Sequence, residues 1–227
     1  MVVAGKIFRF SEQITLEETY NSLKDYKRED SYEENEHKFE LVTEISNLAL
    51  SENSISGLYA EDFVIHLVHR GKAIPVPKTM QAIFQISKCE DKLFLVVLER
   101  KRKANYVANR LSEIIYGRAG AIIEARIPPE ALAEFHMKNP EGTKVVFFDN
   151  VDIPNINKLS LYGPDLKKTE YFEEYCKHGD IWYVMITSKE KGYIVGVTRD
   201  ASVTIFNTNE ATKYLEYVVE NIFPLIP

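Results

Sequence analysis

The sequence has little cysteine, no long apolar run and no excess of positive charge, and each shortage excludes a class of protein. Cys89 and Cys176 are the only cysteines among 227 residues, too few for a disulfide framework or a zinc cluster. We expect two separate thiols in a reducing compartment; a bridge between them is the alternative for a hyperthermophile. The apolar run 93–98 is far shorter than the roughly 20 residues of a membrane-spanning helix. Because the N-terminus also lacks a signal-peptide pattern, we predict a cytoplasmic protein without membrane contact.

Positive charge is in the minority. The chain carries 28 Lys and Arg against 34 Asp and Glu, a formal net charge of −6. Strong non-specific binding to phosphates needs many cations and is therefore not expected, although a local basic patch can still bind nucleic acid. The apolar content of 45% is ordinary for a globular protein and sufficient for a core.

Hydrophobic periodicity and turn residues predict an α+β protein. Thr15 and Glu18 form a capping-box pattern that opens a helix. The charge-dense stretch 28–38 indicates a solvated loop, and Pro75 and Pro77 indicate an edge or loop rather than a central strand. For the first half we expect strands at 3–10, 39–49, 55–69, 80–86 and 92–99, with helices at 15–27 and 103–116.

The second half shows a similar alternation. Gly117 ends the preceding helix, and residues 150–166 form a long connection. We expect strands at 119–127, 143–148, 180–187, 192–198 and 201–206, with helices at 128–137, 169–177 and after 207–210 to about 222. The apolar tail 222–227 is expected to pack on its own domain, with a partner or second copy as the alternative.

The order of elements suggests two α+β repeats, 1–117 and 118–227, in one mostly antiparallel sheet with helices on one face. This order resembles TATA-binding-protein-like domains, in which two repeats form a curved sheet. The resemblance lies in the order of elements and covers most of the chain. It implies a fold but not a function.

The densest basic cluster lies where a strand meets a helix. It comprises Arg100, Lys101, Arg102, Lys103, Asn105, Asn109 and Arg110. Cations and amides near a helix N-terminus suit phosphate oxygens, so these residues are the candidate nucleic-acid contact. The alternative is a solvated junction beside Glu99 and Glu113.

The same junction contains Glu99-x-Lys101, a tripeptide that metal-dependent nucleases place at a strand end. A second carboxylate would have to come from Asp62, but a predicted strand lies between Asp62 and Glu99. Asp149 and Asp152 form another acidic pair that could hold the metal ion. Asp and Asn also end strands through local hydrogen bonds, which is the simpler interpretation of that pair. His66 and His69 lie three apart on a strand and point to opposite faces, so we expect no metal site and no cofactor.

Aromatic residues are plentiful on the predicted strands, where they serve either a core or a base-stacking face. The set comprises Tyr59, Phe63, Phe84, Phe94, Tyr183 and Tyr193. With no nucleophile or phosphate-loop motif, the sequence favours a non-enzymatic binding module for nucleic acid or a protein partner. A scaffold subunit, alone or as a homo-oligomer, and a metal-dependent nuclease are the alternatives.

Overall fold

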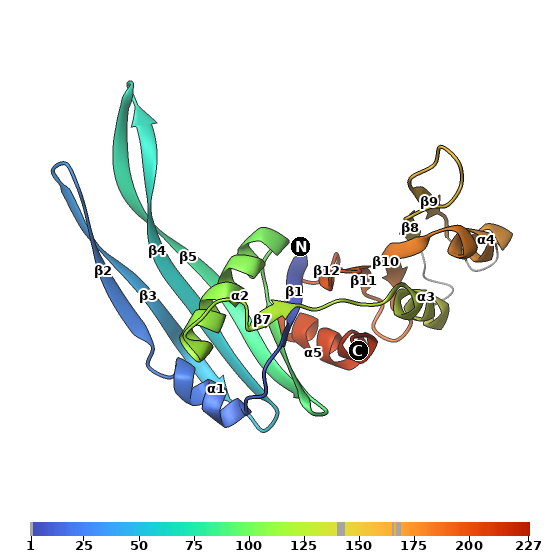
Figure 1. Cartoon of the computed structure of the whole chain (residues 1–227), viewed down its shortest axis with the longest axis horizontal. Coiled ribbons are helices and arrows are strands. Elements are labelled where there is room, and N and C mark those ends of the chain that lie inside the picture. The colour runs from blue at the N-terminus through green and yellow to red at the C-terminus, as the bar shows by residue number, and fades with distance from the viewer. Residues whose placement is uncertain (1, 140–143, 165, 167–168) are drawn as a thin grey trace. The chain divides into compact units, whose positions relative to one another are not determined.

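The computed structural model describes residues 2–139, 144–164, 166 and 169–227 (Figure 1). They form an α+β protein dominated by antiparallel strands, which confirms the expected class. The chain divides into two compact units. Unit 1 contains residues 1–9, 100–102 and 123–227, and unit 2 contains residues 10–99 and 103–122. The halves 1–117 and 118–227, as related repeats, and their resemblance to TATA-binding-protein-like domains stay predictions.

Unit 2 is built from long hairpins. Its strands follow the order β2-β3-β4-β5-β6. They are β2 (Lys27–Glu34), β3 (His37–Leu50), β4 (Ser54–His69), β5 (Lys72–Cys89) and β6 (Lys92–Val97). Two helices, α1 (Leu16–Leu23) and α2 (Lys101–Tyr116), accompany them, although the first two residues of α2 group with unit 1. The buried side of α2 consists of Ala104, Val107, Ala108, Leu111 and Ser112.

Unit 1 has shorter strands in the order β1-β12-β11-β10-β8-β9, with β7 paired to β1. They are β1 (Val3–Phe10), β7 (Ile122–Glu124), β8 (Val145–Asp149), β9 (Leu159–Tyr162), β10 (Asp180–Thr187), β11 (Ile194–Thr198) and β12 (Ser202–Ile205). The helices are α3 (Pro129–Lys138), α4 (Glu170–His178), α5 (Ala211–Asn221) and a 3₁₀ turn, Phe223–Leu225.

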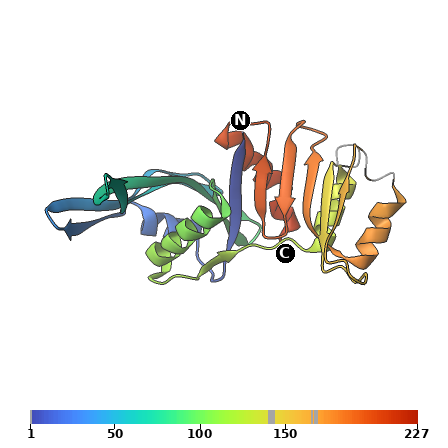
Figure 2. The ribbon, with the colours of Figure 1, turned by 90° about the horizontal axis from the view of Figure 1, so that it is seen from above.

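One face of the unit 1 sheet carries the core. Val184, Val197 and Val203 are fully buried there, and the Tyr214 hydroxyl of α5 donates to the Val203 carbonyl at 3.0 Å. Helices α3 and α5 both lie below these strands in Figure 1, and Figure 2 shows the strands from above. Strand alternation therefore sends the intervening side chains to the face opposite these helices.

Several local predictions are confirmed. Thr15 caps α1 in a capping box, with Glu18 N donating to Thr15 Oγ1 at 3.1 Å. Gly117 ends α2 with a φ of 69°, a conformation that costs glycine little. The apolar tail packs on its own unit, since Phe223, Leu225 and Ile226 are buried. No helix among the described residues is long and apolar enough to cross a membrane.

Other local predictions are wrong. The charged stretch 28–38 is not a loop: it contains β2, an edge strand with exposed side chains on both faces. Pro75 and Pro77 lie within the continuous strand β5, where only β4 pairs with it, because β6 covers just Phe84–Cys89. Of the two expectations for these prolines, the edge position is therefore confirmed and the loop is wrong. The expected strand 119–127 shrinks to β7, and the long connection holds β9.

Candidate nucleic-acid interface

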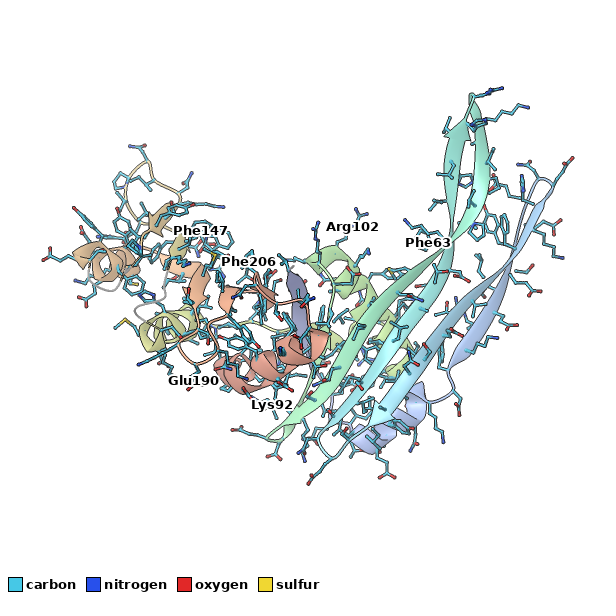
Figure 3. The ribbon with its side chains drawn as sticks, turned by 180° about the vertical axis from the view of Figure 1, so that it is seen from behind. Phe63, Lys92, Arg102, Phe147, Glu190 and Phe206 are labelled. Carbon is cyan, nitrogen blue, oxygen red and sulfur yellow. The ribbon has the colours of Figure 1, made fainter. Side chains whose placement is uncertain are left out.

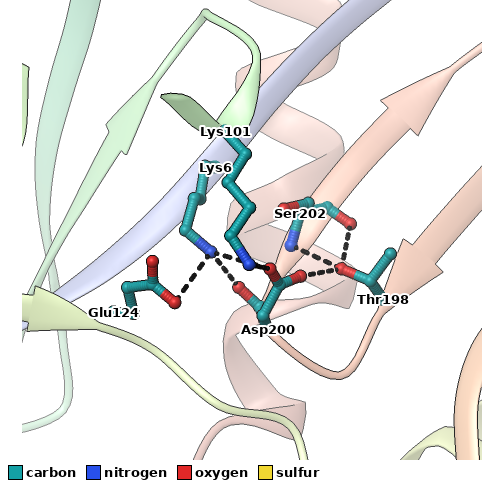
Figure 4. Close-up of polar contacts among 6 residues, drawn as sticks. All are labelled: Lys6, Lys101, Glu124, Thr198, Asp200 and Ser202. Atoms are coloured by element: carbon teal, nitrogen blue, oxygen red, sulfur yellow. Dashed lines mark hydrogen bonds and ion pairs between the residues drawn. The ribbon is translucent and has the colours of Figure 1, made fainter. Parts of the chain in front are cut away.

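Unit 1 contains a fully buried lysine. Lys6 of β1 is fully buried and its ammonium donates to the Asp200 carbonyl at 2.6 Å (Figure 4). It also lies 3.3 Å from Asp200 Oδ2 and 3.5 Å from Glu124 Oε2. A buried cation is tolerated only when anions and acceptors surround it, so these contacts fix the Arg199–Asp200 turn against β1.

Asp200 collects further donors from the surface. Both Lys101 Nζ and Thr198 Oγ1 hydrogen-bond to its carboxylate (Figure 4). Burial alone would raise the pKa of Asp200, but the bonds from Lys101 and Thr198 and the charge of Lys6 outweigh burial and lower it. The same hydrogen bond, which Lys101 donates to Asp200, raises the pKa of Lys101. Asp200 is therefore an anion at every physiological pH.

A pocket of about 430 Å³ opens beside this network. Its lining consists of Lys101, Asp149, Lys158, Trp182, Thr198, Arg199, Asp200 and Ser202. Arg199 and Asp149 form a bidentate pair with both N–O distances at 2.9 Å. Lys158 is exposed and has no ion pair among the described residues; its ammonium lies 5.6 Å from the Trp182 ring centroid. We call this cavity the polar pocket.

Aromatic rings continue from the polar pocket across the open face of the sheet. Phe147 of β8 pairs in register with Tyr183 of β10, and their ring centroids are 5.3 Å apart. Trp182 lies 5.3 Å and Tyr162 5.7 Å from Phe147. A register shift between Ile181 and Tyr183 breaks strict alternation, so Trp182 and Tyr183 both contact Phe147. We call Tyr162, Phe147, Tyr183 and Trp182 the aromatic row.

The aromatic row is only partly covered by protein. Tyr162 is 68% exposed, whereas Phe147, Trp182 and Tyr183 are half-buried. Burial raises the pKa of Tyr183, whose ring lies over Gly196. A β-carbon on Gly196 would stand 2.5 Å from the Tyr183 hydroxyl, so only glycine allows this ring position. The result is a set of neighbouring, mutually tilted rings beside a polar pocket.

The predicted basic junction is only partly brought to this site. Of its seven residues, Lys101 lines the polar pocket. Arg100 and Arg102 are exposed, and Lys103 pairs with Glu99 at 3.3 Å. Arg110 is half-buried and bound to Glu61 and Glu113, which gives it a structural role in unit 2.

The two amides of the junction differ from each other. Asn109 is exposed on α2, whereas Asn105 is half-buried and already engaged. Of the predicted aromatic residues, Tyr183 belongs to the row, and Tyr59, Phe84 and Phe94 are core. Phe147, Tyr162, Trp182 and Lys158 were not predicted as a group, because Tyr162 and Lys158 fall in the expected connection 150–166 and a bulge in β10 disrupts the alternation.

The carboxylates of the nuclease hypothesis each have a local partner. Asp62 accepts from Val42 N at 3.1 Å and from Thr79 Oγ1 at 2.6 Å. Asp152 binds His178 at 2.8 Å, and Asp149 is held by Arg199. Within the described residues, no three His, Cys, Asp or Glu side chains gather in a way that could hold a metal ion. No observation favours nuclease chemistry.

A search against protein-family models finds no match for this chain, and a search against curated proteins finds none either.

Proposed function

We propose that unit 1 binds single-stranded nucleic acid, with bases stacked on the aromatic row and phosphates placed near the polar pocket. The observation that carries the proposal is the set of neighbouring rings on the sheet face opposite α3 and α5, with Lys158 beside them. Proteins that bind single strands combine such rings with cations that follow the backbone. Figure 3 shows the labelled Phe147 from behind, relative to Figure 1.

Stacking rather than charge supplies most of the affinity in this proposal. A stacked base contributes about 1–3 kcal/mol, so three bases at about 2 kcal/mol each supply about 6 kcal/mol, which corresponds to a Kd of tens of micromolar. Lys101 and Arg199 are already paired with Asp200 and Asp149, which reduces their attraction for phosphate. Among the described residues, Lys158 is left as the main free cation at the site. We therefore expect a shallow salt dependence, with a slope of about +1 to +2 in log Kd against log salt.

Trp182 provides a direct measurement because it is the only tryptophan in the chain. Its fluorescence should be quenched when 12-residue oligo(dT) or oligo(U) is added at about 50 mM salt, where electrostatic contacts are least screened. Phe147→Ala should weaken binding about tenfold by removing the central ring of the row. Lys158→Ala should weaken it less and make the salt slope shallower by about 0.7.

Tyr171→Ala is the matched control, since Tyr171 is an exposed tyrosine of α4 in the same unit but outside the row. The affinity of this variant for the single strand should equal that of the unmodified protein. Either of two results would disprove the proposal: no quenching by any single strand at low salt, or equal loss of affinity in Phe147→Ala and Tyr171→Ala. A duplex of the same sequence should compete poorly, because its bases are already stacked.

A further inference from the structure

The hairpin formed by β4 and β5 extends beyond the rest of the unit 2 sheet. The register of β3 on β4 ends at the pair Thr43 and Glu61, whereas β4 and β5 stay paired as far as His69 and Lys72. We call residues 62–79 the hairpin arm; it rises along β4 and β5 in Figure 1. Past Glu61, β4 and β5 pair as strands only with each other among the described residues, although the side chains of Asp62 and His66 still bind Val42 and Glu34.

The arm combines exposed apolar side chains with cations. Residues 63–89 contain no Asp or Glu, although the chain has 34 of them. Arg70, Lys72 and Lys78 are exposed and have no ion pair among the described residues. Leu67 is 52% exposed, Phe63 40% and Ile74 37%. Contiguous apolar exposure of this kind marks an interaction surface more often than scattered single residues do.

The register places these features on one face of the arm. Antiparallel partners share a face, and the pairs are Phe63 with Lys78, Ile65 with Val76, Leu67 with Ile74, and His69 with Lys72. This face is therefore an apolar stripe with Lys78 at its base and Lys72 at its tip, and we call it the stripe face. The opposite face carries Val68 and His66, which binds Glu34 at 2.8 Å.

The β5 edge of the arm is protected against strand addition. Pro75 and Pro77 lie on the part of β5 that β6 leaves unpaired, and proline cannot donate a ladder hydrogen bond. A partner strand would also meet the exposed Lys78 on that edge. A partner strand is therefore disfavoured on the β5 edge, and the stripe face offers the apolar surface for a partner.

Part of the same face is already covered by a helix. Glu61 and Tyr59 precede Phe63 by two and four positions on β4 and so point to the same side. Arg110 of α2 reaches Glu61 at 3.4 Å. Helix α2 thus packs over this face up to Glu61, and the bare stripe continues beyond it. A second helix is the element that would extend this packing.

Charge selects the kind of helix. Lys72 and Lys78 are six residues apart on β5, which corresponds to about 20 Å along a strand. A helix of about 13 residues spans that length, so one with an acidic residue at each end would meet both lysines. A second copy of this chain fits poorly: either two-fold arrangement of two stripe faces brings lysine against lysine. Membrane insertion is disfavoured because the tip, His69 to Lys72, is polar.

We propose that the stripe face of the hairpin arm docks an amphipathic helix of a protein partner, with an apolar stripe of about four turns and acidic residues at both ends. The partner's Leu or Ile side chains would cover Phe63, Leu67 and Ile74, and its carboxylates would pair with Lys72 and Lys78. This inference is independent of nucleic-acid binding by unit 1.

Two synthetic helical peptides test the proposal on the full chain. Both carry the same Leu and Ile stripe over about 16 residues; one ends in glutamates and the other in lysines. By fluorescence anisotropy, the glutamate-ended peptide should bind at least tenfold more tightly. The double variant Lys72→Glu/Lys78→Glu should reverse that preference, because the attraction becomes repulsion.

The opposite face supplies the matched control. Leu67→Asp should weaken binding of the glutamate-ended peptide at least tenfold. Val68→Asp should change the affinity for this peptide less than twofold, although Val68 is more exposed at 76%. Equal effects of these two variants, equal binding of both peptides, or no binding at about 1 mM would overturn the proposal. So would Leu67-dependent dimerisation in light scattering, which indicates a second copy. Leu67-dependent co-sedimentation with anionic vesicles would overturn it in favour of a membrane surface.

Discussion

Each unit contains a polar network around a fully buried group, and these two networks distribute charge differently. In unit 1 the buried group is the cation Lys6, and its anion Asp200 reaches the polar pocket. In unit 2 the buried group is the neutral Tyr59, whose hydroxyl donates to Glu61 at 2.5 Å, while Arg110 closes the network from α2. A buried charge depends on its partner much more than a buried hydroxyl does. The comparison therefore predicts that unit 1 is more sensitive to losing one carboxylate.

The largest effect is expected from Asp200→Ala. Lys6 would keep only Glu124 as a close anion, and we expect the free energy of unfolding to fall by about 3 kcal/mol. Lys6→Met removes the buried charge itself and should cost much less, because an apolar side chain of similar length fills the same space. Urea denaturation of both variants checks this. A larger loss of unfolding free energy in Lys6→Met than in Asp200→Ala would contradict this expectation. It would mean that Lys6 itself stabilises unit 1.

A smaller effect is expected at the corresponding carboxylate of unit 2. Glu61→Ala leaves the Tyr59 hydroxyl and the Arg110 guanidinium without their shared acceptor, which should cost about 2 kcal/mol. Burial is the main reason that the pKa of Tyr59 is raised, so the hydroxyl stays neutral and no charge is stranded. Tyr59→Phe in the same background should recover about 1 kcal/mol in a double-mutant cycle. Additive effects of the two substitutions would contradict the network.

Acid provides a third way to separate the networks. The pKa of Asp200 is lower in the folded protein than its ordinary value of 3.8. Its contribution to stability is therefore complete above that value and is lost as the pH falls below about 4. Asp200→Asn should remove this part of the acid dependence, so that the Tm falls less between pH 4 and pH 2 than in the unmodified protein. An equal fall in Tm between pH 4 and pH 2 in the two proteins would disprove the contribution of Asp200 to the acid dependence.

Local signals in the sequence predict most of the elements, but not how they combine into sites. The capping box at Thr15 and the strand Asp180–Thr187 depend on neighbouring residues alone, and both were predicted correctly. Lys6 could not be recognised, because a lysine in a strand becomes buried only when distant carboxylates surround it. The edge strand β2 was missed since its side chains face water on both sides, which leaves no alternation.

The candidate site shows the same limit. The basic junction was found from its density, yet ion pairs formed in the fold leave only part of it available: Lys101 is bound to Asp200 and Arg110 to Glu61. The aromatic row comes from three strands and a register shift, and neither the shift nor the pairing of β8 with β10 has a signature in the sequence. Pairing partners decide which aromatic residues become a surface and which become core.

The smallest effect on stability is expected at Gly196, one of two glycines that lie under aromatic rings. A β-carbon on Gly57 would stand 2.7 Å from the ring of the fully buried Phe84, so Gly57→Ala should cost about 2 kcal/mol through overpacking. The Tyr183 ring over Gly196 is half-buried and can swing toward solvent. Gly196→Ala should therefore cost less than about 1 kcal/mol but weaken single-strand binding several-fold, because Tyr183 leaves the row. Urea titrations and Trp182 fluorescence measure the two quantities separately. If Gly196→Ala destabilised the fold as much as Gly57→Ala, the aromatic row would be part of the core of unit 1 and not a binding surface.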